Sequence, residues 1–135
     1  LSEHYFWDRS EIDCIVPVPL HWQRYAGRGY NQSVEMARII SKKHLVPVKY
    51  PLLRSKKTSF QHQLSRNERA INLDQAFSLH PLFLLSEHQK EFYKDKHILL
   101  IDDLTTTGAT LASCAQTLML LKPRAFSALV VARAI

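Results

Sequence analysis

The chain has 135 residues, of which 46% are hydrophobic and 22% are charged, an ordinary composition for one globular domain. This composition excludes disorder as the dominant state. The chain contains no apolar run of the roughly 20 residues that a transmembrane helix needs. Two cysteines, Cys14 and Cys114, are too few for a disulfide framework or a four-thiolate zinc site, and unpaired thiols suit the reducing cytoplasm.

The net charge of +6 comes from two segments. Residues 54–69 carry a net charge of +4, and residues 19–33 carry Arg24 and Arg28 with no acid, a net charge of +2. The charges of the remaining residues cancel. Because both segments look like loops, the pattern favours a compact site for a polyanion and leaves nucleic acid open as a partner.

The first part of the chain predicts a strand, a loop and a helix in succession. Residues 12–19 form a short β-branched, apolar run that ends at two prolines, which predicts a buried strand. Residues 20–30 contain two glycines and have no periodicity, so we expect a loop. Asn31 is a suitable N-cap for a helix over residues 32–43.

The middle of the chain gives weaker signals. Residues 46–53 predict a weak strand because two prolines interrupt them. Residues 55–64 are polar and basic and predict a mobile loop, and a short helix is expected over residues 65–72. Residues 81–96 contain an apolar cluster and then a helix-compatible stretch, to which the sequence assigns no function.

The last part of the chain contains the strongest strand signal, over residues 97–101. Residues 102–107 are expected to form its exit loop, followed by a helix over residues 108–121 that Pro123 ends. Residues 125–132 form another β-rich run. Strands that alternate with helices at this spacing predict an α/β fold with a mainly parallel sheet flanked by helices. Because the chain begins without Met or a signal-peptide pattern, we expect one domain over residues 1–135 that belongs to a longer protein.

The residues that carry chemistry concentrate near the end of the predicted strand. Asp102 and Asp103 lie at its carboxyl end, where open α/β sheets bind their ligands. The threonines and Gly108 that follow open a helix, so they offer backbone N–H groups and hydroxyls to a phosphate. Because carboxylates repel phosphate, the two acids must face hydroxyl groups or a magnesium ion of the same ligand. Ribose 5-phosphate is the simplest molecule that meets both requirements.

Residues 98–110 resemble the signature with which type I phosphoribosyltransferases bind phosphoribosyl pyrophosphate (PRPP). The signature is an apolar strand, two acids and a threonine-glycine loop. The resemblance implies that Asp102 and Asp103 form the catalytic pair and bind the ribose 2′- and 3′-hydroxyls. It also implies Mg²⁺ as the cofactor, bound through PRPP, with the same two acids as candidate ligands. The implied phosphate-binding residues are Thr105, Thr106, Thr107, Gly108, Ala109 and Thr110.

A narrower resemblance extends over nearly the whole chain. Motifs of ComF-like proteins occur in the expected order, from residues 16–19 (Val-Pro-Val-Pro) and 28–32 (Arg-Gly-Tyr-Asn-Gln) to residues 132–133 (Ala-Arg). This family is linked to DNA uptake in competent bacteria, so the resemblance implies competence machinery as a partner. Full-length members commonly begin with a four-cysteine zinc element, which this sequence lacks.

The resemblance also assigns roles to the two basic segments. In type I enzymes the loop that corresponds to residues 19–31 binds pyrophosphate, which implies contacts from Arg28 and Gly29. Residues 55–64 correspond to a flexible hood that closes over the reacting complex and excludes water. The implied residues of the hood are Lys56, Lys57, Gln61 and Arg69.

The sequence therefore predicts a PRPP-binding protein that transfers phosphoribosyl to an acceptor which the sequence does not identify. The alternative is a non-catalytic module that senses PRPP or binds single-stranded DNA. In the DNA hypothesis, Trp22 and Tyr25 lie beside basic side chains and stack on bases. The same two rings could instead pack the loop against the domain.

Overall fold

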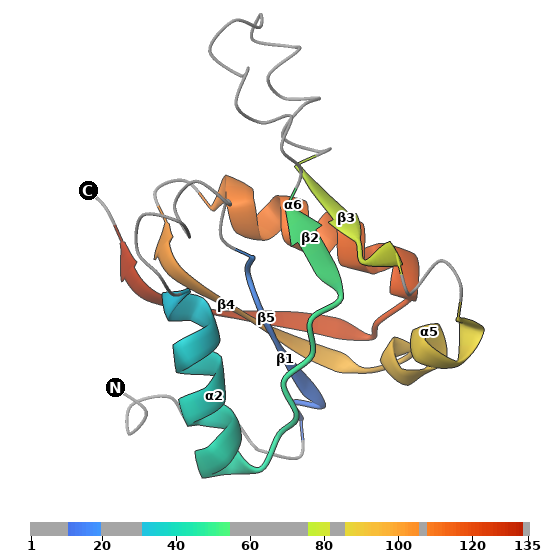
Figure 1. Cartoon of the computed structure of the whole chain (residues 1–135), viewed down its shortest axis with the longest axis horizontal. Helices are drawn as coiled ribbons and strands as arrows, with labels where there is room; N and C mark the ends of the chain where they lie inside the picture. The colour runs from blue at the N-terminus through green and yellow to red at the C-terminus, as the bar shows by residue number, and fades with distance from the viewer. Residues whose placement is uncertain (1–10, 20–30, 55–75, 82–85, 106–107, 134–135) are drawn as a thin grey trace, which may run out of the picture.

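A parallel sheet forms the centre of the fold (Figure 1). The structure is a computed structural model, and it describes residues 11–19, 31–54, 76–81, 86–105 and 108–133. Within these ranges, β4 lies between β1 and β5, and both neighbours pair with it in parallel. The strands are β1 (Cys14–Pro17), β4 (His97–Thr105) and β5 (Ala125–Arg133).

A further segment extends the sheet on the other side of β1. Ile15 donates its N–H to the carbonyl of Pro47 at 2.9 Å, and Lys49 donates its N–H to the carbonyl of Ile15 at 2.8 Å. The spatial order is therefore residues 47–49, β1, β4 and β5. Because the chain passes from β1 to one neighbour and later to the other, the sheet has a topological switch point between β1 and β4.

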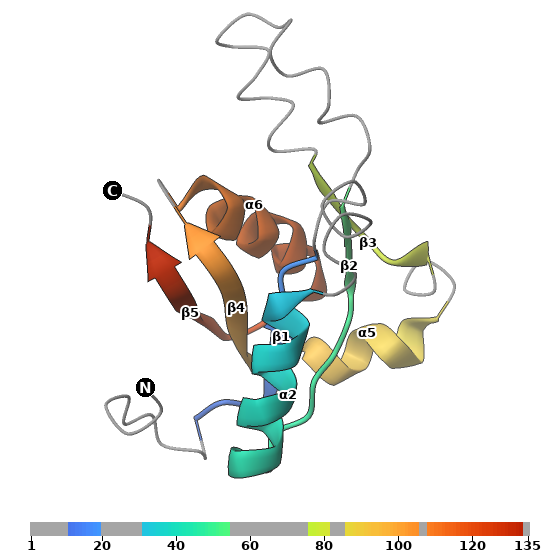
Figure 2. The same cartoon turned by 60° about the vertical axis from the view of Figure 1, so that its left-hand side comes forward.

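Helix α2 (Gln32–His44) covers one face of the sheet (Figure 2). It begins at Asn31, whose side-chain oxygen accepts hydrogen bonds from the N–H groups of Ser33 and Val34, so the predicted helix and its cap are confirmed. A buried apolar cluster joins the helix to the sheet. Its members are Ile12, Ile15, Ala37, Ile40, Val46, Leu99 and Ile101.

Helix α6 (Ala109–Leu118) covers the other face, and a short 3₁₀ helix, η2 (Met119–Leu121), continues it. Its residues Cys114 and Leu118 are completely buried, together with Cys14 and Leu100 of the sheet. The free thiols of Cys14 and Cys114 are thus part of the core.

An antiparallel pair of strands and a second helix complete this layer. Strand β2 (Leu52–Arg54) pairs with β3 (Phe77–Leu79), and Phe77 packs in the same buried cluster as Cys114 and Leu118 of α6. Helix α5 (Glu87–Tyr93) contributes the buried Tyr93 to the same cluster. None of the helices in the described ranges combines the length and the apolar character that a membrane crossing requires.

Strand β4 is longer than the sequence predicts. Its backbone continues to pair with β5 through Asp102, Leu104 and Thr105, so the prediction of an exit loop is wrong for residues 102–105. The polar sequence of this stretch resembles a loop, but a partner strand far away in the chain supplies its hydrogen bonds.

The middle of the chain also differs from the prediction. In place of one strand over residues 46–53, the structure has a parallel bridge at Val48 and then β2, because Pro47 and Pro51 lack the N–H groups of a continuous ladder. Strand β3 gave no signal in the sequence, and the predicted helix and loop between residues 55 and 72 lie outside the described residues. The final helix ends as an α-helix at Leu118, before η2.

Raising the pH above 9 should destabilise the fold through its two buried thiols. Burial is the main cause that raises the pKa of Cys14 and of Cys114 from 9.0 to about 12. Between these values the unfolded chain loses thiol protons that the folded chain retains. The free energy of unfolding should therefore fall by about 1 kcal/mol per pH unit for each thiol, which urea titrations at several pH values would measure.

The Cys114→Ala variant is the matched control for this prediction. It should be less stable at pH 8 because it leaves a cavity, but its free energy of unfolding should fall less steeply between pH 9 and pH 12. Equal slopes for the variant and the original chain would contradict the assignment of this pH dependence to the thiol.

Candidate functional site

Two adjacent carboxylates lie where β4 passes the end of β1. Asp102 is buried, with 6% of its surface exposed, and Asp103 is half-buried. Oδ1 of Asp102 accepts a hydrogen bond from the backbone N–H of Asp103 at 2.9 Å, which orients the buried carboxylate. Because successive side chains of a strand alternate, Asp102 lies on the α6 face of the sheet and Asp103 on the α2 face. Burial of a carboxylate is costly, which marks this position as a candidate for function.

The surroundings of Asp102 include Cys114 of α6 and Arg54 of β2. The pKa of the Cys114 thiol is raised mainly by burial and further by the charge of Asp102, whereas the charge of Arg54 lowers it. Both charged groups therefore lie within electrostatic reach of the same thiol. The guanidinium of Arg54 also lies over the ring of Phe77, 5.2 Å from its centroid. The sequence gave Arg54 no role in the site, although its position at the start of the basic segment was the available signal.

Gly108 bends the backbone at the start of α6. Gly108 directly precedes the helix and has a φ of 81°, in the left-handed region that glycine adopts without steric penalty. A Cβ atom at this position would meet no atom within 4 Å, so backbone conformation, and not lack of space, selects glycine. The first turn of α6 contains no acidic residue, and the positive end of the helix is therefore suited to an anion.

The first basic segment begins and ends beside the acidic pair. Val18, directly after β1, donates its N–H to the carbonyl of Ile101 at 2.9 Å, one residue before Asp102. Asn31 donates its side-chain N–H to the carbonyl of Val18 at 3.3 Å. Residues 20–30 lie outside the described part of the chain, but both ends of this segment are held at the carboxyl end of β1.

The second basic segment is also anchored at both ends. Strand β2 ends at Arg54 and β3 begins at Phe77, and these two residues are partners in the antiparallel ladder. The hydroxyl of Thr117 in α6 donates to the carbonyl of Phe77 at 3.3 Å. The chain therefore leaves and rejoins the described structure against α6, on the face of the sheet that carries Asp102.

The described structure contains only part of the predicted site. It includes Asp102, Asp103, Gly108, Ala109 and Thr110, together with the backbone of Thr105. The other predicted residues lie outside the described ranges, and they are Arg28, Gly29, Lys56, Lys57, Gln61, Arg69, Thr106 and Thr107.

The acidic pair provides the hard oxygen ligands that Mg²⁺ prefers. Among the residues that the structure describes, no group of three or more His, Cys, Asp or Glu side chains could hold a metal ion. Mg²⁺ is commonly bound by one or two carboxylates together with the phosphates of a substrate. The donor set therefore fits a magnesium ion that arrives with a phosphorylated ligand.

The arrangement has two chemically different sides that are close together in the chain. The carboxylates of Asp102 and Asp103 can accept hydrogen bonds from hydroxyl groups. The turn at Gly108 and the N-terminal end of α6 can hold an anion. A ligand that suits both sides carries hydroxyl groups and a phosphate on one small frame.

Comparisons with known proteins find relatives that are named for DNA utilization and competence. The chain is 35% identical over 109 residues to the DNA utilization protein YhgH of Escherichia coli K12, and 34% identical over 107 residues to competence protein F of Haemophilus influenzae. It is 31% identical over 105 residues to competence protein ComFC of Bacillus subtilis. No family model matches the chain.

These similarities cover 79%, 78% and 78% of this chain but 43%, 44% and 38% of the respective relatives. The chain thus spans less than half the length of the curated relatives that it matches. The similar segment includes most of the described fold, and three differently named relatives agree on the same group. On this evidence the chain belongs to the ComF family of DNA-utilization and competence proteins.

Proposed function

We propose that this chain binds PRPP together with Mg²⁺ and transfers its phosphoribosyl group to an acceptor. The observation that carries the proposal is the position of Asp102 and Asp103 beside the switch point between β1 and β4, with the Gly108 turn and α6 directly after them. Ligands of open α/β sheets bind at such a point. The order of the strands also supports the type I phosphoribosyltransferase-like fold that the sequence resemblance implies.

In the proposed complex each part of the site has one task. Asp102 and Asp103 accept hydrogen bonds from the ribose 2′- and 3′-hydroxyls, and the loop over residues 105–110 holds the 5′-phosphate. The segment with Arg28 and Gly29 binds pyrophosphate. The remaining basic segment forms a hood over the complex through Lys56, Lys57, Gln61 and Arg69.

The proposed reaction breaks the bond between ribose C1 and the pyrophosphate oxygen and forms a bond between C1 and the acceptor. The electron pair of the broken bond leaves with pyrophosphate, and the ribose acquires oxocarbenium character. The two carboxylates fix the ring so that C1 faces the acceptor. When bound, Mg²⁺ supplies positive charge that stabilises the leaving pyrophosphate.

A second candidate function is binding of single-stranded DNA, and the relatives' names, which refer to DNA utilization and competence, favour a role that involves DNA. One net-positive segment leaves and rejoins the described structure at the carboxyl end of β1, and the other does so beside α6. A nucleic-acid strand presents phosphates to such segments. The DNA function requires no turnover of PRPP. It predicts affinity that falls steeply as the salt concentration rises.

The double variant Asp102→Asn/Asp103→Asn should lose most of its affinity for PRPP but retain its affinity for inorganic phosphate. Each lost charge-assisted hydrogen bond is worth about 1.5–3 kcal/mol, so the loss of two should weaken PRPP binding by about 100-fold or more in calorimetric titrations with Mg²⁺. An asparagine oxygen can still accept the hydrogen bond from the N–H of residue 103. The fold should therefore persist.

Asp95→Asn is the matched control, because Asp95 is exposed and precedes the opposite end of β4. This variant should bind PRPP like the original chain. An equal loss of affinity for PRPP and for phosphate in the double variant would contradict the two-sided site.

Gly108→Ala should weaken the binding of PRPP and of inorganic phosphate together. Alanine in the left-handed region costs about 1–2 kcal/mol, and the turn should relax away from the geometry that offers its N–H groups. A thermal unfolding curve should show lower stability, and calorimetry should show both ligands weakened. Unchanged phosphate affinity in a destabilised variant would place the phosphate elsewhere.

A panel of bases and amines, tested for release of pyrophosphate from PRPP in the presence of Mg²⁺, distinguishes an enzyme from a binding module. We expect release with at least one acceptor and none in the double aspartate variant. Binding of PRPP without release across a broad panel would instead support the non-catalytic alternative, and tight, salt-sensitive binding of single-stranded DNA would specify it further.

A further inference from the structure

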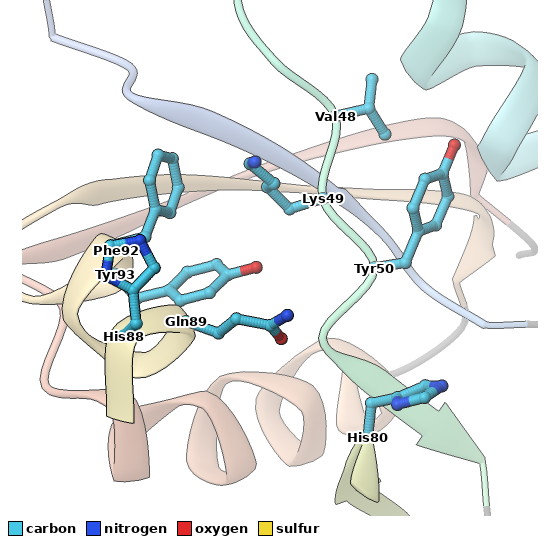
Figure 3. A pocket seen from close by; sticks show the side chains of 8 residues that line it. All are labelled: Val48, Lys49, Tyr50, His80, His88, Gln89, Phe92 and Tyr93. Atoms are coloured by element: carbon cyan, nitrogen blue, oxygen red, sulfur yellow. The ribbon is translucent and has the colours of Figure 1, made fainter. Parts of the chain in front are cut away.

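A cavity of about 520 Å³ lies away from the acidic pair. It is a partly open hollow between residues 48–50, His80 and one face of α5 (Figure 3). Its volume falls within the range of sites that bind small molecules. Neither β4 nor the turn at Gly108 contributes a lining residue, so this cavity is separate from the site proposed for PRPP.

Among the described residues that line the cavity, Lys49 carries the one formal charge. Lys49 lines it, and its ammonium lies 4.6 Å from the centroid of the Phe92 ring, a cation–π contact that holds the charge at the wall. His80 and His88 add two imidazole rings. Among the described residues, no carboxylate lines this cavity. The wall therefore favours an anionic ligand.

The acidic residues of helix α5 lie on a side of the helix that does not line the cavity. Its residues Glu87 and Glu91 line a different hollow, together with Lys90 and Lys94. The face with Gln89 and Phe92 is directed to the cavity. The absence of acid at the wall thus follows from the helical arrangement of α5, since acids on the same short helix lie on its other side.

The cavity is also lined by aromatic rings and by an amide, Gln89, that can form hydrogen bonds with the edge of a heterocycle. The rings of Phe92 and Tyr93 meet edge to face, with centroids 5.0 Å apart, and Tyr50 adds a ring that is 51% exposed. Figure 3 shows the hydroxyl of Tyr93 and the amide of Gln89 extending from α5 toward the chain segment with Lys49.

We propose that this cavity is a second ligand site that binds a nucleotide, with the phosphate near Lys49 and the base near Gln89. Inorganic phosphate would contact Lys49 but not the aromatic side chains. A neutral base would contact the aromatic side chains but would leave Lys49 without an anion. The side-chain amide of Gln89 provides both the donor and the acceptor that a heterocyclic edge requires, and the exposed ring of Tyr50 provides stacking surface. The inference does not depend on turnover of PRPP.

Titration of the full chain with adenosine 5′-monophosphate (AMP) tests the site. Lys49→Met keeps the apolar stem but removes the charge, and it should weaken AMP binding by about 10-fold or more. Lys49→Arg should retain most of the affinity. Lys90→Met is the matched control on the other side of α5, where Lys90 pairs with Glu87, and it should bind AMP normally. Gln89→Leu is a second variant that should weaken AMP if Lys49→Met proves unstable in thermal unfolding.

AMP contains a ribose 5-phosphate, so the site proposed for PRPP can hold it as well. The Lys49 and Gln89 variants are therefore compared in the Asp102→Asn/Asp103→Asn background, which should retain the AMP binding that depends on Lys49. Adenosine and inorganic phosphate should each bind more weakly than AMP. A titration with a short single-stranded oligonucleotide that carries a 5′-phosphate distinguishes a free nucleotide from the end of a strand as the ligand. Affinity that depends on Lys49 supports the site for either ligand. Three results would overturn the proposal. They are absence of AMP binding, AMP binding by Lys49→Met and Gln89→Leu that is as tight as without these substitutions, and loss of AMP binding only in the aspartate variant.

Discussion

The parallel pairing of β1 with β4 positions the acidic pair and the ends of the first basic segment. At one end of the pairing, the N–H of His97 donates to Oδ2 of Asp13 at 2.8 Å. At the other end, Val18 pairs with Ile101. A slip of one residue would exchange the two faces of β4 and turn the Asp102 side chain toward α2. The register is therefore a condition for the proposed site, as well as for the core.

Negative and positive charges lie in different parts of the molecule. The carboxylates that would accept hydrogen bonds from sugar hydroxyls lie on the central strand β4. The excess of positive charge belongs to two segments that leave the described structure and rejoin it. The positive end of α6 lies next to the acids in the chain, and Gly108 makes the sharp turn between them possible. A single ligand with a diol and phosphates can satisfy these regions together, which is the physical basis of the PRPP proposal.

The sequence predicted the elements that local signals define. Asn31 and the apolar positions after it predicted α2, and the apolar run before Asp102 predicted the start of β4. The sequence could not show that β4 continues to Thr105, because the hydrogen bonds come from β5. It could not show β3 for the same reason, since a three-residue strand has little pattern of its own and forms through its pairing with β2.

The candidate site was predictable in part. The acidic pair and Gly108 form a continuous motif, so their chemistry could be interpreted directly from the chain. The place of Arg54 near Cys114 depends on packing between distant elements. The cavity beside α5 likewise requires residues 48–50 and 88–93 to meet in space, and the sequence assigned no function to that part of the chain.

The most direct test of the account maps the binding of PRPP residue by residue. In a titration of the ¹⁵N-labelled chain with PRPP and Mg²⁺, the account predicts the largest changes in amide signals at Asp103, Gly108 and Ala109. The amide signals of Lys49 and Gln89, in the separate cavity, should change little. Saturating PRPP that leaves the signals from Asp103 to Ala109 unchanged, or that shifts mainly those of Lys49 and Gln89, would contradict a phosphoribosyl site at the junction of β1 and β4.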